Sequence, residues 1–383
     1  MKKKILIALS YVLVAVIAAG TVLVCSSLDR IKNVSKLDAV ERLLLSRFIG
    51  ETDRKTMEDA ASAAMVAALG DRWSYYMTAE QYQSYLQTMS NSYVGIGITV
   101  QTLQEGGITV LEVVPEGPAE EAGILAGDIV IAVDGTDITA MEVSEASTLI
   151  RGAEGTDVTL TVDRAGETLT VTVTRRKFQT PVATGEMLQD NIGLITIENF
   201  DDRCAEETIA ALEQLQEQGA TALIFDVRNN PGGYKHELVK VLDYLLPEGV
   251  LFQTEEYLGR KETDTSDARC LDLPMAVVMN LQSYSAAEFF AAALEEYDAA
   301  VTVGEKTFGK GYFQTAIALS DGSAINLSIG KYYTPKGVSL AGNGLIPDIP
   351  VEVDAETAQK IAAGTLAPAE DPQILAAINA LKS

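Results

Sequence analysis

The spacing of the hydrophobic positions changes several times along this chain, and each spacing predicts a different kind of element. Residues 5–25 form an apolar run without a single charge. In residues 28–89 the apolar positions recur every three or four residues, which is typical of amphipathic helices. In residues 93–176 short alternating stretches are separated by glycines, which indicates strands and turns. The first half of the chain therefore predicts an apolar helix, a helical lead-in and a β domain.

Short apolar strands alternate with helical stretches in the second half of the chain, which indicates a largely parallel sheet covered by helices. The expected strands are residues 192–197, 222–227, 275–279 and 300–303. The expected helices are residues 208–215, 236–246 and 286–294. The remaining expected elements are a connector at residues 178–191, a hairpin formed by residues 312–318 and 324–333, and a C-terminal helix at residues 371–381.

These elements predict a multidomain chain of mixed α+β and α/β class. At 383 residues the chain is long enough for two or three domains that each bury a core. The helical lead-in and the C-terminal tail leave open whether they pack within one chain or form a homodimer. The expected segments are a membrane anchor or signal (residues 1–27), a helical region (28–90), a small β domain (91–177), an α/β core (178–352) and a helical tail (353–383).

The N-terminus has the pattern of a membrane anchor. Three lysines precede the apolar run of residues 5–25, and a helix of that length spans a bilayer core of about 30 Å. Lysines before a span stay in the cytoplasm, so the rest of the chain is expected outside it. A cleaved signal peptide shares this pattern. We favour an uncleaved single-pass anchor, because the small residues 18–20 lie inside the run and Val24 before Cys25 fits a lipoprotein site poorly.

Composition restricts the chemistry further. The single histidine, His236, leaves a serine–histidine triad only one available base and excludes a histidine-rich metal site. His236 falls within an expected helix and we interpret it as incidental. The three cysteines, Cys25, Cys204 and Cys270, form no CxxC pair, so zinc and thioredoxin-like chemistry are not expected, nor is any other metal or cofactor. The net charge of −25 argues against nucleic acid as a partner, because phosphate contacts need a cationic surface.

Ser285 stands where the expected strand 275–279 breaks into the expected helix 286–294. The first turn of a helix leaves backbone N–H groups free beside such a residue. Downstream, Lys310 lies between two glycines in a Phe-Gly-Lys-Gly stretch. Taken singly, a serine before a helix is most often an N-cap, and a lysine between glycines is most often a solvated turn residue. In a chain with one histidine, however, we interpret Lys310 as the base for Ser285.

Two glycine-containing turns offer backbone amides to an anion. Pro231-Gly232-Gly233 leaves bare amides ahead of a helix, where they can donate to a developing oxyanion, although an ordinary strand-to-helix turn has the same pattern. Gly95-Ile96-Gly97 forms an anion cradle that needs no cation, although a glycine-rich β domain without a ligand is the alternative.

Residues 91–177 resemble a PDZ domain. The motifs that carry the resemblance are Gly95-Ile96-Gly97, residues 118–128, and Arg151-Gly152 followed by Gly155-Thr156. The resemblance implies that the amides of Gly95, Ile96 and Gly97 hold the terminal carboxylate of a peptide, which adds as a strand to an open sheet edge. We hypothesise that Arg151 carries the signal of peptide binding to the catalytic core, and a solvated turn arginine is the alternative.

From about residue 37 to its end the chain resembles the carboxy-terminal processing (tail-specific) serine proteases. The motifs that carry this resemblance are residues 69–71, the PDZ-like segment, and residues 226–233, 283–288, 304–311, 314 and 344–348. The resemblance implies that Ser285, not Ser283, is the nucleophile, and that Lys310, not Lys306, is its base. It further implies that Gln314 orients the lysine. The oxyanion hole is then expected from the amide of Ala286 with that of Gly232 or Gly233.

Three details bear on the implied mechanism. Residues 283–288 read Ser-Tyr-Ser-Ala-Ala-Glu where the family has Ser-Ala-Ser-Ala-Ser-Glu, so the bulky Tyr284 affects substrate fit near the oxyanion hole. A reference pKa of about 10.4 leaves roughly one lysine in two thousand neutral at pH 7, so a lysine base needs an apolar setting. Gln314 is four residues from Lys310, about 13 Å along an extended strand, so contact between them needs a bend at the glycines.

The implied function is that of a membrane-anchored, extracytoplasmic serine endopeptidase with a Ser-Lys dyad. It is expected to recognise the free C-termini of protein substrates through the PDZ domain and to cleave near them. The alternative is a catalytically inactive PDZ-bearing scaffold or pseudoprotease. The presence of both Ser285 and Lys310 favours the peptidase.

Overall fold

The computed structural model describes residues 35–102 and 106–382. The anchor predicted at residues 5–25 lies outside these ranges. Within them, no helix is both long enough and apolar enough to cross a bilayer. The chain divides into two compact units, Met1–Tyr76 and Met77–Ser383, and each is described by itself.

The described part of the first unit is helical, as the spacing of its apolar residues predicts. It contains α2 (Lys36–Arg47) and α3 (Arg54–Ala67), and β1 (Tyr75–Met77) starts at its end. Ser35 forms a capping box with Asp38 at the start of α2, and the Asp53 carboxylate accepts hydrogen bonds from the first turn of α3. No residue of α2 is buried, so its apolar side chains are uncovered within this unit.

The second unit opens with α4 (Ala79–Met89) and the predicted β domain. Strand β2 (Ser92–Gly95) enters the domain and pairs antiparallel with β9 (Arg176–Gln179), which leaves it. The domain's sheet has the order β3-β4-β5-β7-β8, with β6 on β5, and every pair is antiparallel. Its elements are β3 (Ile98–Thr102), β4 (Ile108–Val113), α5 (Pro118–Glu121), β5 (Ile129–Val133), β6 (Thr136–Asp137), α6 (Val143–Ile150), β7 (Asp157–Arg164) and β8 (Glu167–Thr174).

A second sheet has the order β10-β11-β12-β15-β16-β19 and is parallel except for β10, which confirms the predicted largely parallel sheet. All five residues of β12 and all five of β15 are buried, as expected for strands covered on both faces. The strands are β10 (Ala183–Met187), β11 (Ile192–Ile197), β12 (Ala222–Asp226), β15 (Met275–Met279), β16 (Ala300–Gly304) and β19 (Ile349–Pro350).

The expectation that residues 178–191 form only a connector is wrong. Strand β10 lies within them, followed by the 3-10 turn η1 (Gln189–Asn191). Strand β10 is a sheet edge with three exposed residues in a row, so its sequence lacks the apolar alternation of a half-buried strand.

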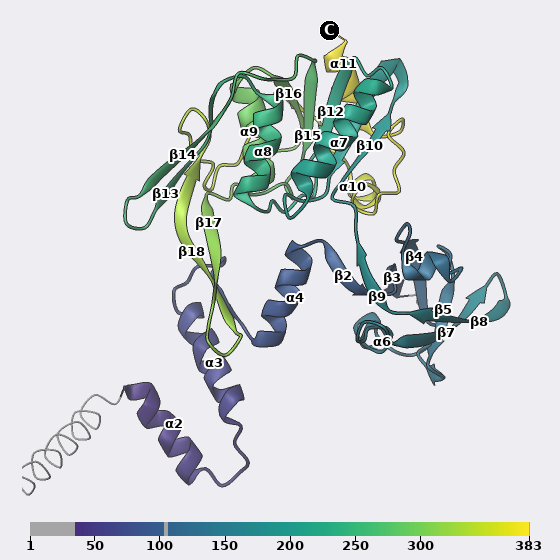
Figure 1. Ribbon diagram of the computed structural model, residues 1–383, viewed down its shortest axis with the longest axis vertical. Helices are drawn as coiled ribbons and strands as arrows, with labels where there is room; N and C mark the ends of the chain where they lie inside the picture. The colour runs from purple at the N-terminus through teal and green to yellow at the C-terminus, as the bar shows by residue number, and fades with distance from the viewer. Residues whose placement is uncertain (1–34, 103–105, 383) are drawn as a thin grey trace, which may run out of the picture. The chain divides into compact units, whose positions relative to one another are not determined.

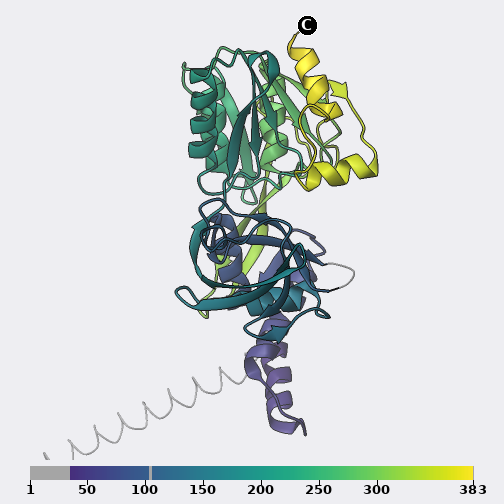
Figure 2. The same ribbon diagram turned by 90° about the vertical axis from the view of Figure 1, so that its right-hand side faces the viewer.

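Helices cover both faces of the parallel sheet (Figures 1 and 2). On one face lie α7 (Cys204–Glu217), α8 (Lys235–Leu245) and α9 (Ala286–Glu296), around a core that contains Phe289 and Phe290. On the other face lies α11 (Pro372–Leu381), whose Ile374 packs with Ile224 and other residues of a smaller core. Figure 2 shows the strands between the green helices and the yellow C-terminal helix. The tail also contains α10 (Ala355–Ala362).

A third sheet stands beside the core. Strand β18 (Ala324–Tyr333) pairs antiparallel with β17 (Tyr312–Ala318), which confirms the predicted hairpin, and also with β13 (Gly249–Glu256). Strand β13 pairs in turn with β14 (Lys261–Ser266). These two strands were not predicted, because charged residues interrupt the apolar positions in both. This sheet brings Tyr332, near the end of β18, toward the start of α9.

Candidate active site

Ser285 occupies the sharp turn between β15 and α9. Its backbone has φ 59° and ψ −124°, a conformation that residues other than glycine rarely adopt. The residue is only 8% exposed. Such strain persists only where the surroundings determine the conformation, and it marks the position as one to examine for function.

A single buried carboxylate, that of Glu288, joins the Ser285 turn to the Phe-Gly-Lys-Gly loop. Its Oε2 accepts hydrogen bonds of 2.9 Å from the backbone N–H groups of both Ser285 and Lys310. Its Oε1 accepts hydrogen bonds of 2.6 Å from the Gly309 N–H and the Thr307 hydroxyl. Burial raises the pKa of Glu288, while these hydrogen bonds oppose the shift. One side chain thus fixes the loop of the predicted base against the turn of the predicted nucleophile.

Lys310 is half-buried on the side of Tyr284, the residue before Ser285. Its Nζ lies 5.9 Å from the centre of the Tyr284 ring, and this ring packs 5.6 Å from that of Phe308. The amine group is therefore placed beside the ring of Tyr284, the residue that departs from the family pattern, and Phe308 packs on that ring. Aromatic faces supply part of the low-dielectric setting that a neutral lysine requires.

The Pro-Gly-Gly turn packs directly against the Ser285 turn. A Cβ atom built on Gly232, which has φ 89°, would lie 2.7 Å from Ser285 Cβ and 2.8 Å from Ala286 N. The Gly232 N–H already donates to Asn230 Oδ1 at 2.8 Å. Gly233 pairs with Phe200 through bonds made by its two neighbours, which leaves its own N–H facing away from Phe200. Of the two glycine amides considered, the described hydrogen bonds therefore engage that of Gly232 and leave that of Gly233 for another acceptor.

Ser283, the alternative nucleophile, has a structural role. The Ser283 hydroxyl is fully buried, donates to the Val227 carbonyl at 2.7 Å and accepts from the Asn280 N–H at 3.0 Å. These bonds tie the turn after β15 to the end of β12. The Ser285 hydroxyl instead accepts a hydrogen bond of 3.0 Å from Tyr332. Sequence reasoning missed Tyr332, which is 47 residues away along the chain, and no local signal marks it.

Two other predicted positions lie in different surroundings. The Gln314 amide donates to the Tyr312 carbonyl and to Ser328 Oγ, both at 3.0 Å, so its described contacts are within the β17–β18 hairpin rather than with Lys310. The His236 side chain is 57% exposed and lies 3.3 Å from Glu237. This placement agrees with the interpretation of His236 as incidental.

The predicted carboxylate-binding turn joins β2 to β3 in the PDZ-like domain. Gly97 has φ 76°, and the Ile96 side chain is buried in the domain core. The Ile96 carbonyl accepts from Ala119 N–H, and the Gly97 carbonyl accepts from Val114 N–H. Strand β3 is at the edge of its sheet and pairs only with β4 among the described strands. An unpaired edge next to this turn is the arrangement that strand addition by a peptide requires.

Arg151 is exposed and ends α6, whereas the buried arginine of this region is Arg175. The Arg175 guanidinium donates hydrogen bonds to the carbonyls of Leu149 and Ile150, and so stabilises the turn at Arg151. The sequence interpretation did not single out Arg175.

Asp201 is a buried carboxyl group next to the Pro-Gly-Gly turn. A Cβ atom on Gly233 would lie 2.6 Å from Asp201 Oδ1, and among the described residues this oxygen has no hydrogen-bond partner. Burial and the neighbouring Asp202 raise the pKa of Asp201 to about 7.

This pKa predicts a pH-dependent stability that Asp201→Asn removes. Because the folded-state pKa lies above the reference value of 3.8, the folded protein binds this proton more tightly than the unfolded chain does. The resulting stability is fully present below about pH 4 and is lost as the pH rises through about 7. Urea unfolding should show about 2–4 kcal/mol less loss between pH 4 and pH 8 in Asp201→Asn than in the wild type. Asp298→Asn, at an exposed position outside this cluster, serves as control, and equal pH profiles for Asp201→Asn and the wild type would refute the assignment.

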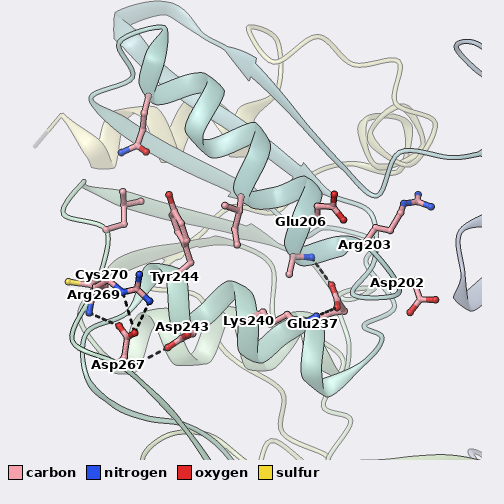
Figure 3. Close-up of a pocket in the computed structure, with 14 residues that line it drawn as sticks. Asp202, Arg203, Glu206, Glu237, Lys240, Asp243, Tyr244, Asp267, Arg269 and Cys270 are labelled. Atoms are coloured by element: carbon pink, nitrogen blue, oxygen red, sulfur yellow. Dashed lines mark hydrogen bonds and ion pairs between the residues drawn. The ribbon is translucent and has the colours of Figure 1, made fainter.

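A groove of about 1020 Å³ lies between α7 and α8 (Figure 3). Its charged groups pair largely among themselves, as Lys240 does with Glu237 and Arg269 with Asp267. None of the residues predicted for catalysis lines it. The strained serine and the converging amides, rather than the volume of this groove, identify the candidate active site.

The arrangement defines a class, a PDZ-bearing serine peptidase, and comparisons with known proteins agree. The model of peptidase family S41 matches residues 191–351, and a PDZ domain model matches residues 109–164. The chain is 35% identical over 321 residues to the carboxy-terminal processing protease CtpA of Bacillus subtilis, a match that covers 83% of this chain and 69% of the relative. It is 32% identical over 323 residues to a CtpA-like serine protease of Staphylococcus epidermidis, a match that covers 83% and 65% of the two chains.

Solved structures show the same likeness. The photosystem II D1 C-terminal processing protease is 27% identical, with a TM-score of 0.50 and coverage of 83% of this chain and 87% of the other. An S41-type protease from Bacteroides fragilis is 18% identical, with a TM-score of 0.59 and coverage of 88% and 92%, and this likeness concerns the fold alone. The chain belongs to peptidase family S41, and it is a serine peptidase of the carboxy-terminal processing type.

Proposed function

We propose that this protein is a membrane-anchored endopeptidase that acts outside the cytoplasm, recognises the free C-terminus of its substrate and cuts near it with a Ser285–Lys310 dyad. The observation that supports the dyad is the position of the Glu288 carboxylate. One of its oxygens accepts hydrogen bonds from the backbone N–H groups of both Ser285 and Lys310. The two backbone nitrogens are therefore no farther apart than the sum of two hydrogen bonds. No local sequence feature requires this meeting of segments separated by 25 positions.

The proposed chemistry begins with a neutral Lys310, which takes the proton of the Ser285 hydroxyl. The Ser285 oxygen then attacks the peptide carbonyl carbon. The amides of Ala286 and Gly233 hold the resulting oxyanion. When the tetrahedral intermediate collapses, Lys310 returns the proton to the departing amine and an acyl-enzyme remains. Water then hydrolyses the ester, with Lys310 again as the base.

The PDZ-like domain is proposed to select the substrate. A peptide can add to the open edge of β3 while its terminal carboxylate meets the amides of Gly95, Ile96 and Gly97. The buried Ala146 and Ile150 of α6 belong to the same domain core as Ile96, so the helix is firmly held beside the sheet. The names of the Bacillus and photosystem II relatives describe processing of C-termini, which supports a tail-directed substrate choice.

The first 27 residues and α2 are proposed to place the enzyme. Lysines followed by the uncharged residues 5–25 support an anchor with the peptidase outside the cytoplasm. In α2 the side chains of Leu37 and Leu43 are 51% and 54% exposed, and Phe48 just after it is 60% exposed. A second copy of this chain is the proposed cover for these apolar side chains, which gives a homodimer.

The test of this proposal compares a free with a blocked C-terminus. An unfolded test protein with an apolar tail should be cut by the purified enzyme about 10–100-fold faster when its C-terminus is a free carboxylate than when it is an amide, because the amide cannot make charge-assisted bonds to the glycine turn. A short fluorogenic peptide with both ends blocked is the control for intact catalysis.

The outcomes separate the possible functions. Equal cleavage of the free and amidated proteins would overturn tail recognition. Binding of the free tail without cleavage of either the protein or the peptide would indicate the noncatalytic scaffold instead.

A further inference from the structure

Tyr332 is the one residue whose side chain the described hydrogen bonds place on the oxygen of Ser285. It comes from β18, next to the last residue of the strand, and its side chain is 4% exposed. Its ring packs at 4.5 Å from Phe289 in a T-shaped pair and at 5.7 Å from Phe252. The Tyr332 backbone N–H also donates to the Gly311 carbonyl at 3.4 Å. The same residue therefore touches the nucleophile through its side chain and the lysine loop through its backbone.

The ring contacts leave the phenol little freedom. Phe313 stacks on the third side of Tyr332 at 6.1 Å, so aromatic rings from β13, β17 and α9 surround it. A buried hydroxyl held in this way needs a partner, because an unpaired one costs about 1–3 kcal/mol. The partner is Ser285 Oγ at 3.0 Å. The packing therefore aims this hydroxyl at the reacting atom.

The hydrogen-bonding capacity of a serine hydroxyl gives this contact a consequence. The Ser285 oxygen has one proton and two lone pairs. When Tyr332 donates to one lone pair, the Ser285 proton stays available for Lys310. The donor also fixes the side-chain rotation of Ser285 before substrate binds, which lowers the cost of reaching the attacking geometry.

The Tyr332 hydroxyl keeps its proton and remains a hydrogen-bond donor during the reaction. Burial and the nearby Glu288 carboxylate raise the pKa of Tyr332 above its ordinary value, although the Ser285 contact opposes the shift. The group therefore cannot serve as the general base near neutral pH, and it keeps its proton. A neutral donor next to an oxygen that becomes negatively charged forms a stronger bond as the charge develops.

We propose that Tyr332 is a further catalytic residue of this peptidase, whose hydroxyl orients Ser285 Oγ and stabilises the negative charge that develops on it. The inference rests on the proposed Ser285 nucleophile. During attack the proton moves from Ser285 Oγ to Lys310 Nζ, the bond from Oγ to the carbonyl carbon forms, and the carbonyl π pair moves to the carbonyl oxygen. When the scissile C–N bond breaks, the amine takes the proton from Lys310. Tyr332 gains and loses no proton in either step.

The matched pair of variants is Tyr332→Phe and Tyr333→Phe. The first removes one hydroxyl and keeps the ring that packs on Phe289. The second removes the hydroxyl of the next residue, which contacts Glu255 at 3.4 Å instead. With the blocked fluorogenic peptide, Tyr332→Phe should lower kcat about 10–100-fold and leave KM within about twofold, because the lost bond is strongest in the transition state. Tyr333→Phe should have wild-type kinetics.

Two further readouts keep the outcome specific. A fluorophosphonate, which reacts with an activated serine without a peptide, should label Ser285 in Tyr332→Phe slower by the same factor as the loss in kcat. The melting temperature of Tyr332→Phe should match that of Tyr333→Phe, which excludes a general loss of structure as the cause.

The results that would overturn the inference differ from those that would overturn the proposed function. Wild-type or higher kcat in Tyr332→Phe, with the wild type active, would overturn the role of Tyr332 alone, and a higher value would indicate that the contact restrains the resting serine. A raised KM with unchanged kcat would also overturn it, because the hydroxyl would then act in substrate binding. A wild-type enzyme that neither cleaves nor reacts with the fluorophosphonate would overturn the Ser285 nucleophile and this inference with it.

Discussion

Ser285→Ala, Lys310→Met and the double variant should each lose about the same factor in cleavage rate, about 10⁴-fold, because the two groups act as one unit. Without the Ser285 oxygen no acyl-enzyme forms, and without the amine the hydroxyl keeps its proton at neutral pH. The positive φ of 59° at position 285 strains serine and alanine alike, so Ser285→Ala should still fold, with a loss of about 1–3 kcal/mol in stability because the buried Tyr332 hydroxyl loses its partner.

The rates are measured with the blocked fluorogenic peptide. Lys306→Met is the matched control, because Lys306 is an exposed lysine of the same loop region, four residues before Lys310. It should keep the wild-type rate. A double variant that is much slower than either single variant would show that Ser285 and Lys310 act independently, and the dyad would have to be abandoned.

Gly232→Ala should lower the cleavage rate about 10²–10³-fold, the effect of disturbing an oxyanion hole. The added methyl would lie 2.7 Å from Ser285 Cβ and 2.8 Å from Ala286 N, so either the Pro-Gly-Gly turn or the Ser285 turn must move. A positive φ of 89° adds strain for any residue with a side chain. Since the Gly232 N–H donates to Asn230, the expected effect comes from this displacement and not from a lost amide donor.

Gly219→Ala separates this displacement from backbone strain. Gly219 has a similar φ of 94°, and a Cβ atom there would meet nothing within 4 Å. The control should lose about 1 kcal/mol of stability and keep its activity. If Gly232→Ala were as active as Gly219→Ala, the packing of this turn on Ser285 would have no part in catalysis.

The strands and helices that position the site were predictable wherever their apolar residues are buried. The strand Met275–Met279, the strand Ile192–Ile197 and both strands of the β17–β18 hairpin have the predicted bounds. Strands β13 and β14 were missed, because charged residues such as Glu255 and Lys261 interrupt their apolar positions, although Phe252 of β13 is buried in the core. The periodicity of apolar residues reflects which face of a strand is buried. It therefore does not detect a strand in which both faces are partly exposed to solvent.

Within the site, the sequence indicated the residues that belong to contiguous motifs and missed those that long-range packing adds. Ser285 and Lys310 each stand in a recognisable stretch, whereas the contribution of Tyr332 depends on β18 folding beside α9. The role of Glu288 was likewise invisible, because only its four described hydrogen bonds show that one carboxylate fixes both loops. The predicted contact between Gln314 and Lys310 needed a bend in the chain, and the described bonds of Gln314 follow the strand instead.

The central claim is that Lys310, in its neutral form, activates Ser285. It is tested most directly by the rate at which a fluorophosphonate labels Ser285 as the pH is varied, in the wild type and in Lys310→Met, with the modified residue located by mass spectrometry. The account predicts that the wild-type rate rises with pH as one group loses its proton, and that Lys310→Met is labelled at least about 10³-fold more slowly and without this rise. Labelling of Lys310→Met at the wild-type rate and with the wild-type pH profile would contradict it.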